Sequence, residues 1–277
     1  LNKKRVQALD AILKENNDFS AIKELVSKVE TPYMVANALV KLQNWNFDHN
    51  IYPELLGSDN SKLVEFTSNY SFQEYRLHGY QWLKQLHFQD WSDDLQILLF
   101  KQLPFNSEIW HILDTLNKNI KDSYWKTVNI NPYQNDSELE LINYLLGYGR
   151  PIGAVECINK MLYHKKEVDS SLIIDVLNKI TDSDEEMRNI DTYAIGQMIK
   201  KLQDDSCVDF ETLALLEWKF YSALEHVTKP KFLREKLKRQ PKFFCELICM
   251  LYKPKDESLI ENEPVHEQKL LSHVWTI

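Results

Sequence analysis

The residues whose types and spacing could carry chemistry are few, and the most conspicuous group is a basic segment at residues 229–242. It holds seven cations and one acid in a chain whose net charge is −8. Such a block can contact a phosphate backbone or an acidic protein face. The candidate contacts to an anionic partner are Lys229, Lys231, Arg234, Lys236, Lys238, Arg239 and Lys242. A solvated helix with Phe232, Leu233 and Leu237 turned inward is the favoured alternative, because basic surface helices are common.

Metal-ligating residues are sparse. Cys245 and Cys249 are four residues apart, and His266 and His273 are seven apart. A structural zinc site usually combines a tight C-x-x-C turn with a second ligand pair, which neither spacing supplies. The sequence therefore predicts no metal and no cofactor.

Signatures of catalysis are also missing from the sequence. It contains no phosphate-binding loop, no dinucleotide-binding glycine motif and no G-x-S-x-G elbow. The cluster Gly147, Gly149 and Gly153 beside Arg150 could hold an anion at a helix N-terminus. A glycine that ends one helix before the next is the more common arrangement, so we expect Gly149 to occupy the left-handed C-terminal position. The chain is predicted not to be an enzyme, although a triad assembled from distant residues stays open.

The elements that must position these groups are helices. Apolar residues recur at helical spacing along most of the chain, and no segment shows sustained alternation typical of a strand. One strong example is expected over residues 210–224, with Asp209 as its N-cap. Helices are also expected over residues 60–76 and 80–88, on either side of Gly79. The predicted fold class is all-α, with essentially no sheet.

A polar break over residues 129–136 indicates two parts. We expect an N-terminal helical subdomain over residues 1–130 and an array of helical hairpins over residues 131–277. Helix starts without a strict sequence repeat are typical of an irregular α-solenoid of the TPR or HEAT kind, and also of an irregular helical domain.

The aromatic residues divide into core and surface candidates. The tryptophans expected in the core, because each lies in an apolar helical stretch, are Trp91, Trp110, Trp125 and Trp218. Trp45 borders an irregular stretch and is the candidate for an exposed interaction hot spot.

Composition limits where the protein works. No apolar run approaches the roughly 18 residues of a membrane-spanning helix, and four cysteines in 277 residues form no disulfide framework. These features predict a cytoplasmic protein that does not enter a membrane. The chain begins with Leu1 rather than Met and ends in a helical pattern, so we expect a fragment of a longer protein.

Several aromatic packing motifs carry a family resemblance over roughly residues 70–277. They are the stretches 103–110, 122–125, 149–154, 216–218, 241–247 and 251–255. These motifs resemble the helical-repeat C-terminal region of large, poorly characterised bacterial multidomain proteins of NTPase-like or defence type. The resemblance implies a shared scaffold, with any catalysis in another part of the parent protein.

Three functional hypotheses follow. The first is a non-catalytic helical-repeat segment that binds a protein partner or acts as a scaffold, with another domain of the parent chain as one candidate partner. The second is nucleic-acid binding through residues 229–242, which is less favoured and requires one contiguous positive face. The third is an unrecognised enzyme, which requires a pocket that gathers titratable groups with shifted pKa values.

Overall fold

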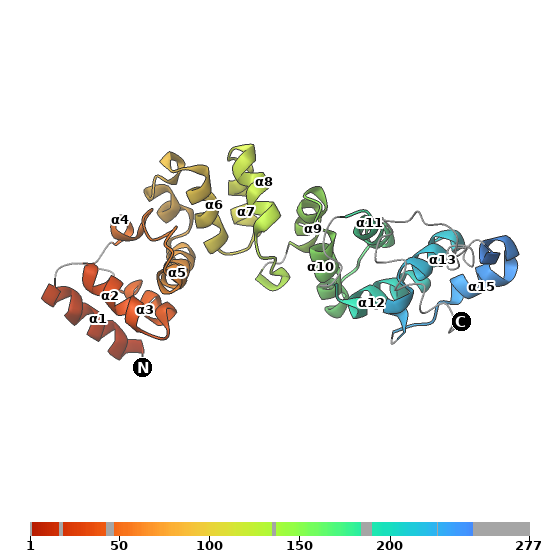
Figure 1. Ribbon diagram of the computed structural model, residues 1–277, viewed down its shortest axis with the longest axis horizontal. Coiled ribbons are helices and arrows are strands. Elements are labelled where there is room, and N and C mark those ends of the chain that lie inside the picture. Colours follow the sequence, from red (N-terminus) through yellow and green to blue (C-terminus); the bar gives the residue numbers. More distant parts are fainter. Residues whose placement is uncertain are drawn as a thin grey trace, which may run out of the picture. The chain divides into compact units, whose positions relative to one another are not determined.

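The protein is all-helical in the computed structural model (Figure 1), which describes residues 2–16, 19–42, 47–134, 137–183, 190–225 and 227–245. Every regular element within these ranges is a helix and none is a strand, so the all-α prediction is confirmed. The chain divides into two compact units, Leu1–Ser137 and Glu138–Ile277. This division falls a few residues beyond the boundary expected after residue 130.

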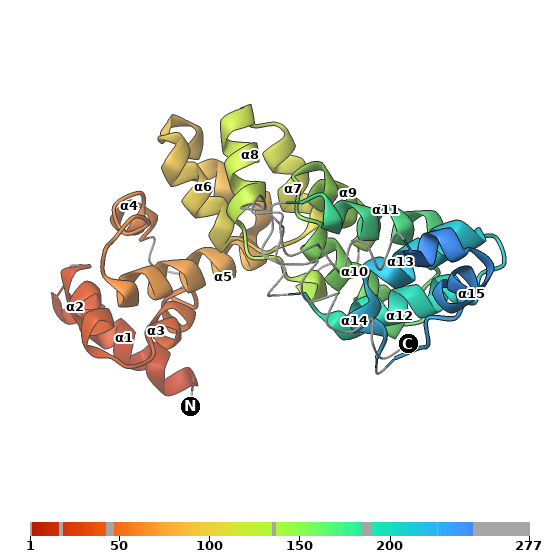
Figure 2. The same ribbon diagram turned by 45° about the vertical axis from the view of Figure 1, so that its right-hand side comes forward.

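The first unit is built around one long helix. In chain order its elements are α1 (Asn2–Asn16), α2 (Ser20–Lys28), α3 (Pro32–Leu39), α4 (Asp48–Ile51), α5 (Ser61–Gln85), η1 (Phe88–Asp90), α6 (Asp93–Gln102), α7 (Ser107–Asp114), α8 (Lys118–Thr127) and η2 (Pro132–Gln134). Helix α5 packs against α2 and α3, which precede it in the chain, and against α6, which follows it. Helix α8 packs against α6 and α7. Figure 2 shows α5 lying beside α3.

Gly79 interrupts α5. Its backbone has φ 59° and ψ −149°, a combination that only glycine adopts readily. Helical geometry stops there and resumes afterwards, in agreement with the two helices expected on either side of Gly79.

Buried aromatic rings form much of the core of the first unit. Trp110 and Trp125 are fully buried, with ring centroids 5.7 Å apart, and Phe105 lies 5.2 Å from Trp110. The core prediction is confirmed for these two tryptophans. It is wrong for Trp91 and Trp218, which are only half-buried, because helical spacing identifies an apolar face but not how completely a neighbour covers it.

The second unit is a succession of helices that pack mainly on near neighbours in sequence. Its elements are α9 (Glu138–Gly147), α10 (Pro151–Tyr163), α11 (Ser170–Thr181), α12 (Thr192–Gln203), α13 (Phe210–Lys219), α14 (Tyr221–Leu224) and α15 (Lys231–Arg239). The closest packing joins α9 to α10, α13 to α15 and α12 to α14, followed by α10 to α11 and α10 to α12. This neighbour-to-neighbour stacking is the pattern that a solenoid-like array requires.

The turn between α9 and α10 shows why this part folds as a hairpin. Gly149 has φ 67°, its N–H donates to Leu146 O at 3.3 Å, and the N–H of Arg150 donates to Leu145 O at 2.8 Å. These two bonds satisfy the last carbonyls of α9 and need a left-handed residue between them. The predicted position of Gly149 is confirmed.

The single helix expected over residues 210–224 is instead two helices. Phe220 leaves helical geometry with φ −114° and ψ 30°, and α14 then packs against α12. Gly196 of α12 makes this approach possible, because a Cβ there would lie 2.6 Å from Ala223 O. Apolar periodicity continues through the break, which is why the sequence pattern does not reveal it.

Candidate interaction surfaces

The basic segment forms helix α15, which lies against α13. Leu233 is fully buried, while Phe232 and Leu237 are half-buried. The inward side of this helix therefore agrees with the sequence prediction.

A buried carboxylate on α13 holds the N-terminus of α15. Glu217 is fully buried, its Oε2 accepts the N–H of Leu233 at 2.7 Å, and its Oε1 accepts Nε2 of Gln203 at 2.5 Å. Burial raises the pKa of Glu217, while the N–H groups of Leu233, Phe232 and Lys231 and the Gln203 amide act to lower it. A carboxylate suits this place because the first N–H groups of a helix lack internal partners and carry partial positive charge.

Gln203 extends this network to the loop before α15. Its Nε2 also donates to Lys229 O at 2.9 Å, and its Oε1 accepts Oγ1 of Thr228 at 2.6 Å. Helices α12, α13 and α15 thus share one polar junction, which fixes the register of the basic helix.

Lys236 and Arg239, both among the predicted cations, lie beside acidic residues. Lys236 pairs with Glu211 and lies 4.5 Å above the Phe243 ring. Arg239 Nε lies 2.8 Å from Glu235 Oε1 on the same helix. These two residues stabilise α15, and their charges are directed to neighbouring acids.

Three cations of α15 share its exposed face. Lys231, Arg234 and Lys238 are exposed and are spaced i, i+3, i+7, which aligns them on one side of a helix. We call these three residues the cationic stripe. Lys229 and Lys242 are exposed on either side of the helix. The contiguous positive face is therefore narrower than the set of seven residues identified in the sequence.

A second surface is an apolar groove in the first unit, formed by α1, α3 and α5. Its volume is about 460 Å³, and its lining residues are Arg5, Val6, Tyr33, Met34, Asn37, Ala38, Val40, Lys41, Gln73 and Leu77. Leu77 and Tyr33 are 61% and 37% exposed. Exposed apolar side chains around a hollow mark an interaction site more strongly than scattered ones do.

The charges of this groove have one sign. Arg5 and Lys41 are its ionisable cations, and none of its lining residues is an acid. The first turn of α1 also contains Lys3, Lys4 and Arg5 and no acidic residue. An anionic group placed beside these cations would therefore be attracted to this end of the groove.

A buried polar network in the first unit gathers two carboxylates. Asp48 Oδ1 accepts the Tyr70 hydroxyl at 3.3 Å, and Asp48 Oδ2 accepts Nε1 of Trp82 at 3.2 Å. Burial raises the pKa of Asp48. Burial and then the Asp48 charge raise the pKa of Glu74 to about 7, and His78 Nε2 lies 3.6 Å from Glu74 Oε2.

Carboxylates with raised pKa values are expected in an acid–base catalytic site. Here the carboxylate of Asp48 accepts hydrogen bonds from Tyr70 and Trp82. These bonds connect α4 to the parts of α5 before and after Gly79. Neither Asp48 nor Glu74 lines the groove, or either of two further cavities of about 430 and 300 Å³. The hydrogen bonds of Asp48 therefore explain how α4 is fixed to α5, and they do not point to a catalytic role for this network.

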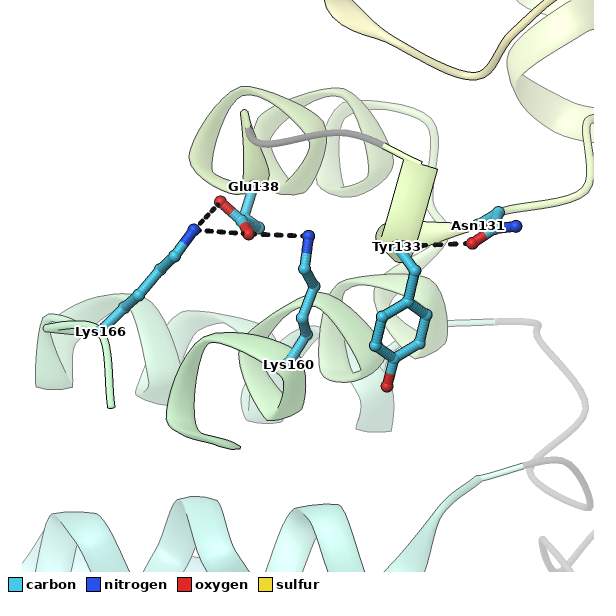
Figure 3. Close-up of polar contacts among 5 residues, drawn as sticks. All are labelled: Asn131, Tyr133, Glu138, Lys160 and Lys166. Carbon is cyan, nitrogen blue, oxygen red and sulfur yellow. Dashed lines mark hydrogen bonds and ion pairs between the residues drawn. The ribbon is translucent and has the colours of Figure 1, made fainter. Parts of the chain in front are cut away.

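The second unit contains a charged network at the open end of the α9–α10 hairpin (Figure 3). Glu138 Oε1 lies 2.9 Å from Lys160 Nζ and 2.8 Å from Lys166 Nζ, and both Glu138 and Lys160 are buried. Burial alone would raise the pKa of Glu138, but hydrogen bonds from Lys166 and Lys160 outweigh it and lower the pKa to about 2. This network joins the first residue of α9 to the end of α10.

Several predicted residues fall outside the part of the chain that the structure describes. They are Trp45, Cys249, His266 and His273. Cys245 is exposed. Within the described ranges no three His, Cys, Asp or Glu residues gather to hold a metal ion, and no described helix has the length and apolarity needed to cross a membrane.

Sequence reasoning missed both Glu217 and the apolar groove. A signal existed for Glu217, because it follows Leu213 by four residues and so occupies the apolar face of its helix. The groove had no comparable signal, since its residues come from three separate segments.

No family model matches this chain, and no curated protein or solved structure matches it either.

Proposed function

We propose that the chain is a non-catalytic helical-repeat segment that binds a protein partner. The observation that carries this proposal is the α1–α3–α5 groove, with Leu77 61% exposed at its rim. Holding an apolar side chain in water forgoes about 25 cal/mol per Å² of apolar area that a partner could cover. A protein surface is the partner that can supply a matching apolar area.

The stacked helices support the same proposal. Arrays in which each helix pair packs on its neighbours present extended surfaces for proteins. In line with the aromatic motifs described above, we infer a cytoplasmic scaffold segment of TPR or HEAT kind in a large bacterial protein. The partner would then be a separate protein or another domain of the same parent chain.

Nucleic-acid binding is the second candidate, and the cationic stripe is the observation in its favour. Duplex DNA binding weakens with salt by a log–log slope of about −0.9 for each neutralised phosphate. Three cations would give a slope of about −3, which is shallow beside that of dedicated DNA-binding proteins. The stripe therefore supports an auxiliary contact more than a principal function.

The proposal is tested by affinity capture from lysates of the source cells, with the 277-residue chain as the bait. The capture is done with and without nuclease treatment of the lysate. Protein binding predicts that the same protein partner is recovered under both conditions. Recovery that disappears after nuclease treatment would instead favour the nucleic-acid candidate.

A further inference from the structure

We propose that the α1–α3–α5 groove receives an amphipathic helix whose apolar residues enter the groove and whose acidic residues face Arg5 and Lys41. This inference rests on the proposed protein-binding function and names the chemistry of the partner. It also assigns the binding site to the first unit rather than to the basic helix of the second.

The apolar part of the proposal follows from the groove's floor and rim. Val6, Met34 and Val40 line it and are half-buried, while Tyr33 and Leu77 are exposed. Its volume of about 460 Å³ lies within the range of sites that enclose ligand groups. Several apolar side chains of one partner segment can enter together and displace water from these residues.

The acidic part follows from charge complementarity. The groove contains two cations and no acid in a chain that is acidic overall. Lys3 and Lys4 are exposed in the adjoining first turn of α1. A carboxylate beside these groups would be attracted by the cationic side chains, whereas a basic partner would be repelled.

The helical form of the partner follows from the scaffold. Addition of a peptide strand requires an exposed sheet edge, and no strand occurs among the residues that the structure describes. Grooves between helices bind amphipathic helices through apolar residues at i, i+3, i+4 and i+7. The amides of Asn37 and Gln73, which also line the groove, can bond to polar groups at the edge of such a helix.

The test is a selection from a displayed library of amphipathic helices of about 18 residues, or five turns. Apolar positions are drawn from Leu, Ile, Phe and Met, and flanking positions from Glu, Gln and Lys. The expected result is enrichment of Glu at the flanks among clones that bind the 277-residue chain. Failure to enrich binders, or enrichment of Lys at the flanks, would overturn the proposal.

Two variants locate the binding. Leu77→Ser should weaken the selected helices by about tenfold or more, which is about 1.4 kcal/mol, and Lys41→Glu should favour clones in which Lys replaces Glu. Leu98→Ser is the matched control, since Leu98 is an exposed leucine on α6 outside the groove. Unchanged binding by Leu77→Ser, with melting temperatures equal to the unsubstituted chain, would exclude the groove.

The same variants separate this inference from the proposed function. If a nuclease-resistant protein partner is captured equally by the unsubstituted chain and Leu77→Ser, protein binding stands and the groove assignment is overturned. If no such partner is captured by either chain, the proposed function and the inference fall together.

Discussion

Glu217 on α13 accepts the backbone N–H of Leu233 on α15 at 2.7 Å, and this bond places a buried carboxylate at the start of the basic helix α15. The carboxylate lies on the inner side of α15, whereas Lys231, Arg234 and Lys238 lie on the outer side. The exposed cations therefore depend on a buried acid for their arrangement, although no ion pair joins them to it.

Replacing Glu217 with Ala should destabilise the second unit by about 1–3 kcal/mol, because the N–H groups at the start of α15 lose a charged acceptor. Chemical unfolding measures the loss, and amide hydrogen exchange at Leu233 should quicken. Glu211 lies on the same helix as Glu217 and is the exposed partner of Lys236. Glu211→Ala should therefore lower the stability much less. Equal effects from the two variants would show that burial of the carboxylate is unimportant.

Lys165 occupies a position that favours glycine. It has φ 56° at the end of α10, where the N–H of Lys166 donates to Met161 O at 2.9 Å in the arrangement also seen at Gly149. Lys165→Gly should stabilise the second unit by up to about 1 kcal/mol, since left-handed backbone costs a residue with a Cβ about 1–2 kcal/mol. Lys165→Ala keeps that strain and removes the charge, so a gain of equal size in this control would contradict the backbone explanation.

The half-burial of Trp218 predicts unequal costs for two tryptophan deletions. Trp125→Ala should reduce stability by about 3–5 kcal/mol, the usual range for a fully buried aromatic residue, and Trp218→Ala should reduce it by less. Denaturant unfolding of the two variants compares them directly. If Trp218→Ala lowers the stability as much as Trp125→Ala does, the Trp218 ring is as fully buried as the Trp125 ring.

The raised pKa of Glu74 predicts a pH-dependent stability of the first unit. Its pKa rises from 4.5 to about 7 on folding, so the folded state binds the proton more tightly than the unfolded state. The stability associated with this residue is fully present below about pH 4.5 and is lost as the pH rises through about 7. The facing groups are Asp48, Tyr70 and His78.

Glu74→Gln should flatten the decline in unfolding midpoint that the unsubstituted chain shows between about pH 5 and pH 8. His78→Gln is the control that removes the neighbouring imidazole and keeps the Glu74 carboxyl. If His78→Gln removes the decline and Glu74→Gln leaves it intact, Glu74 is not its source.

Local patterns revealed most of the helices, whereas the surfaces depended on packing between distant segments. Asp209 could be identified as an N-cap because a capping side chain bonds to an N–H a few residues ahead, and its Oδ1 accepts the N–H of Thr212 at 2.9 Å. Gly149 could be identified because the required backbone geometry excludes most other residues.

The interruption at Phe220 could not be identified in this way. It depends on Gly196, which lies in a different helix and leaves room for α14. The groove likewise forms only when α1, α3 and α5 bring Arg5, Lys41 and Leu77 together. Helical spacing places each residue on a face of its own helix, but it does not specify which distant face lies opposite.

The most direct test of the central claim is quantitative affinity capture by the 277-residue chain and by a triple variant, Lys231→Gln, Arg234→Gln and Lys238→Gln, with nuclease added to half of each lysate. A helical protein-binding segment predicts one protein partner in equal amounts in all four samples. Loss of that partner after nuclease treatment, together with its loss from the triple variant, would contradict the account and assign the principal function to the cationic stripe.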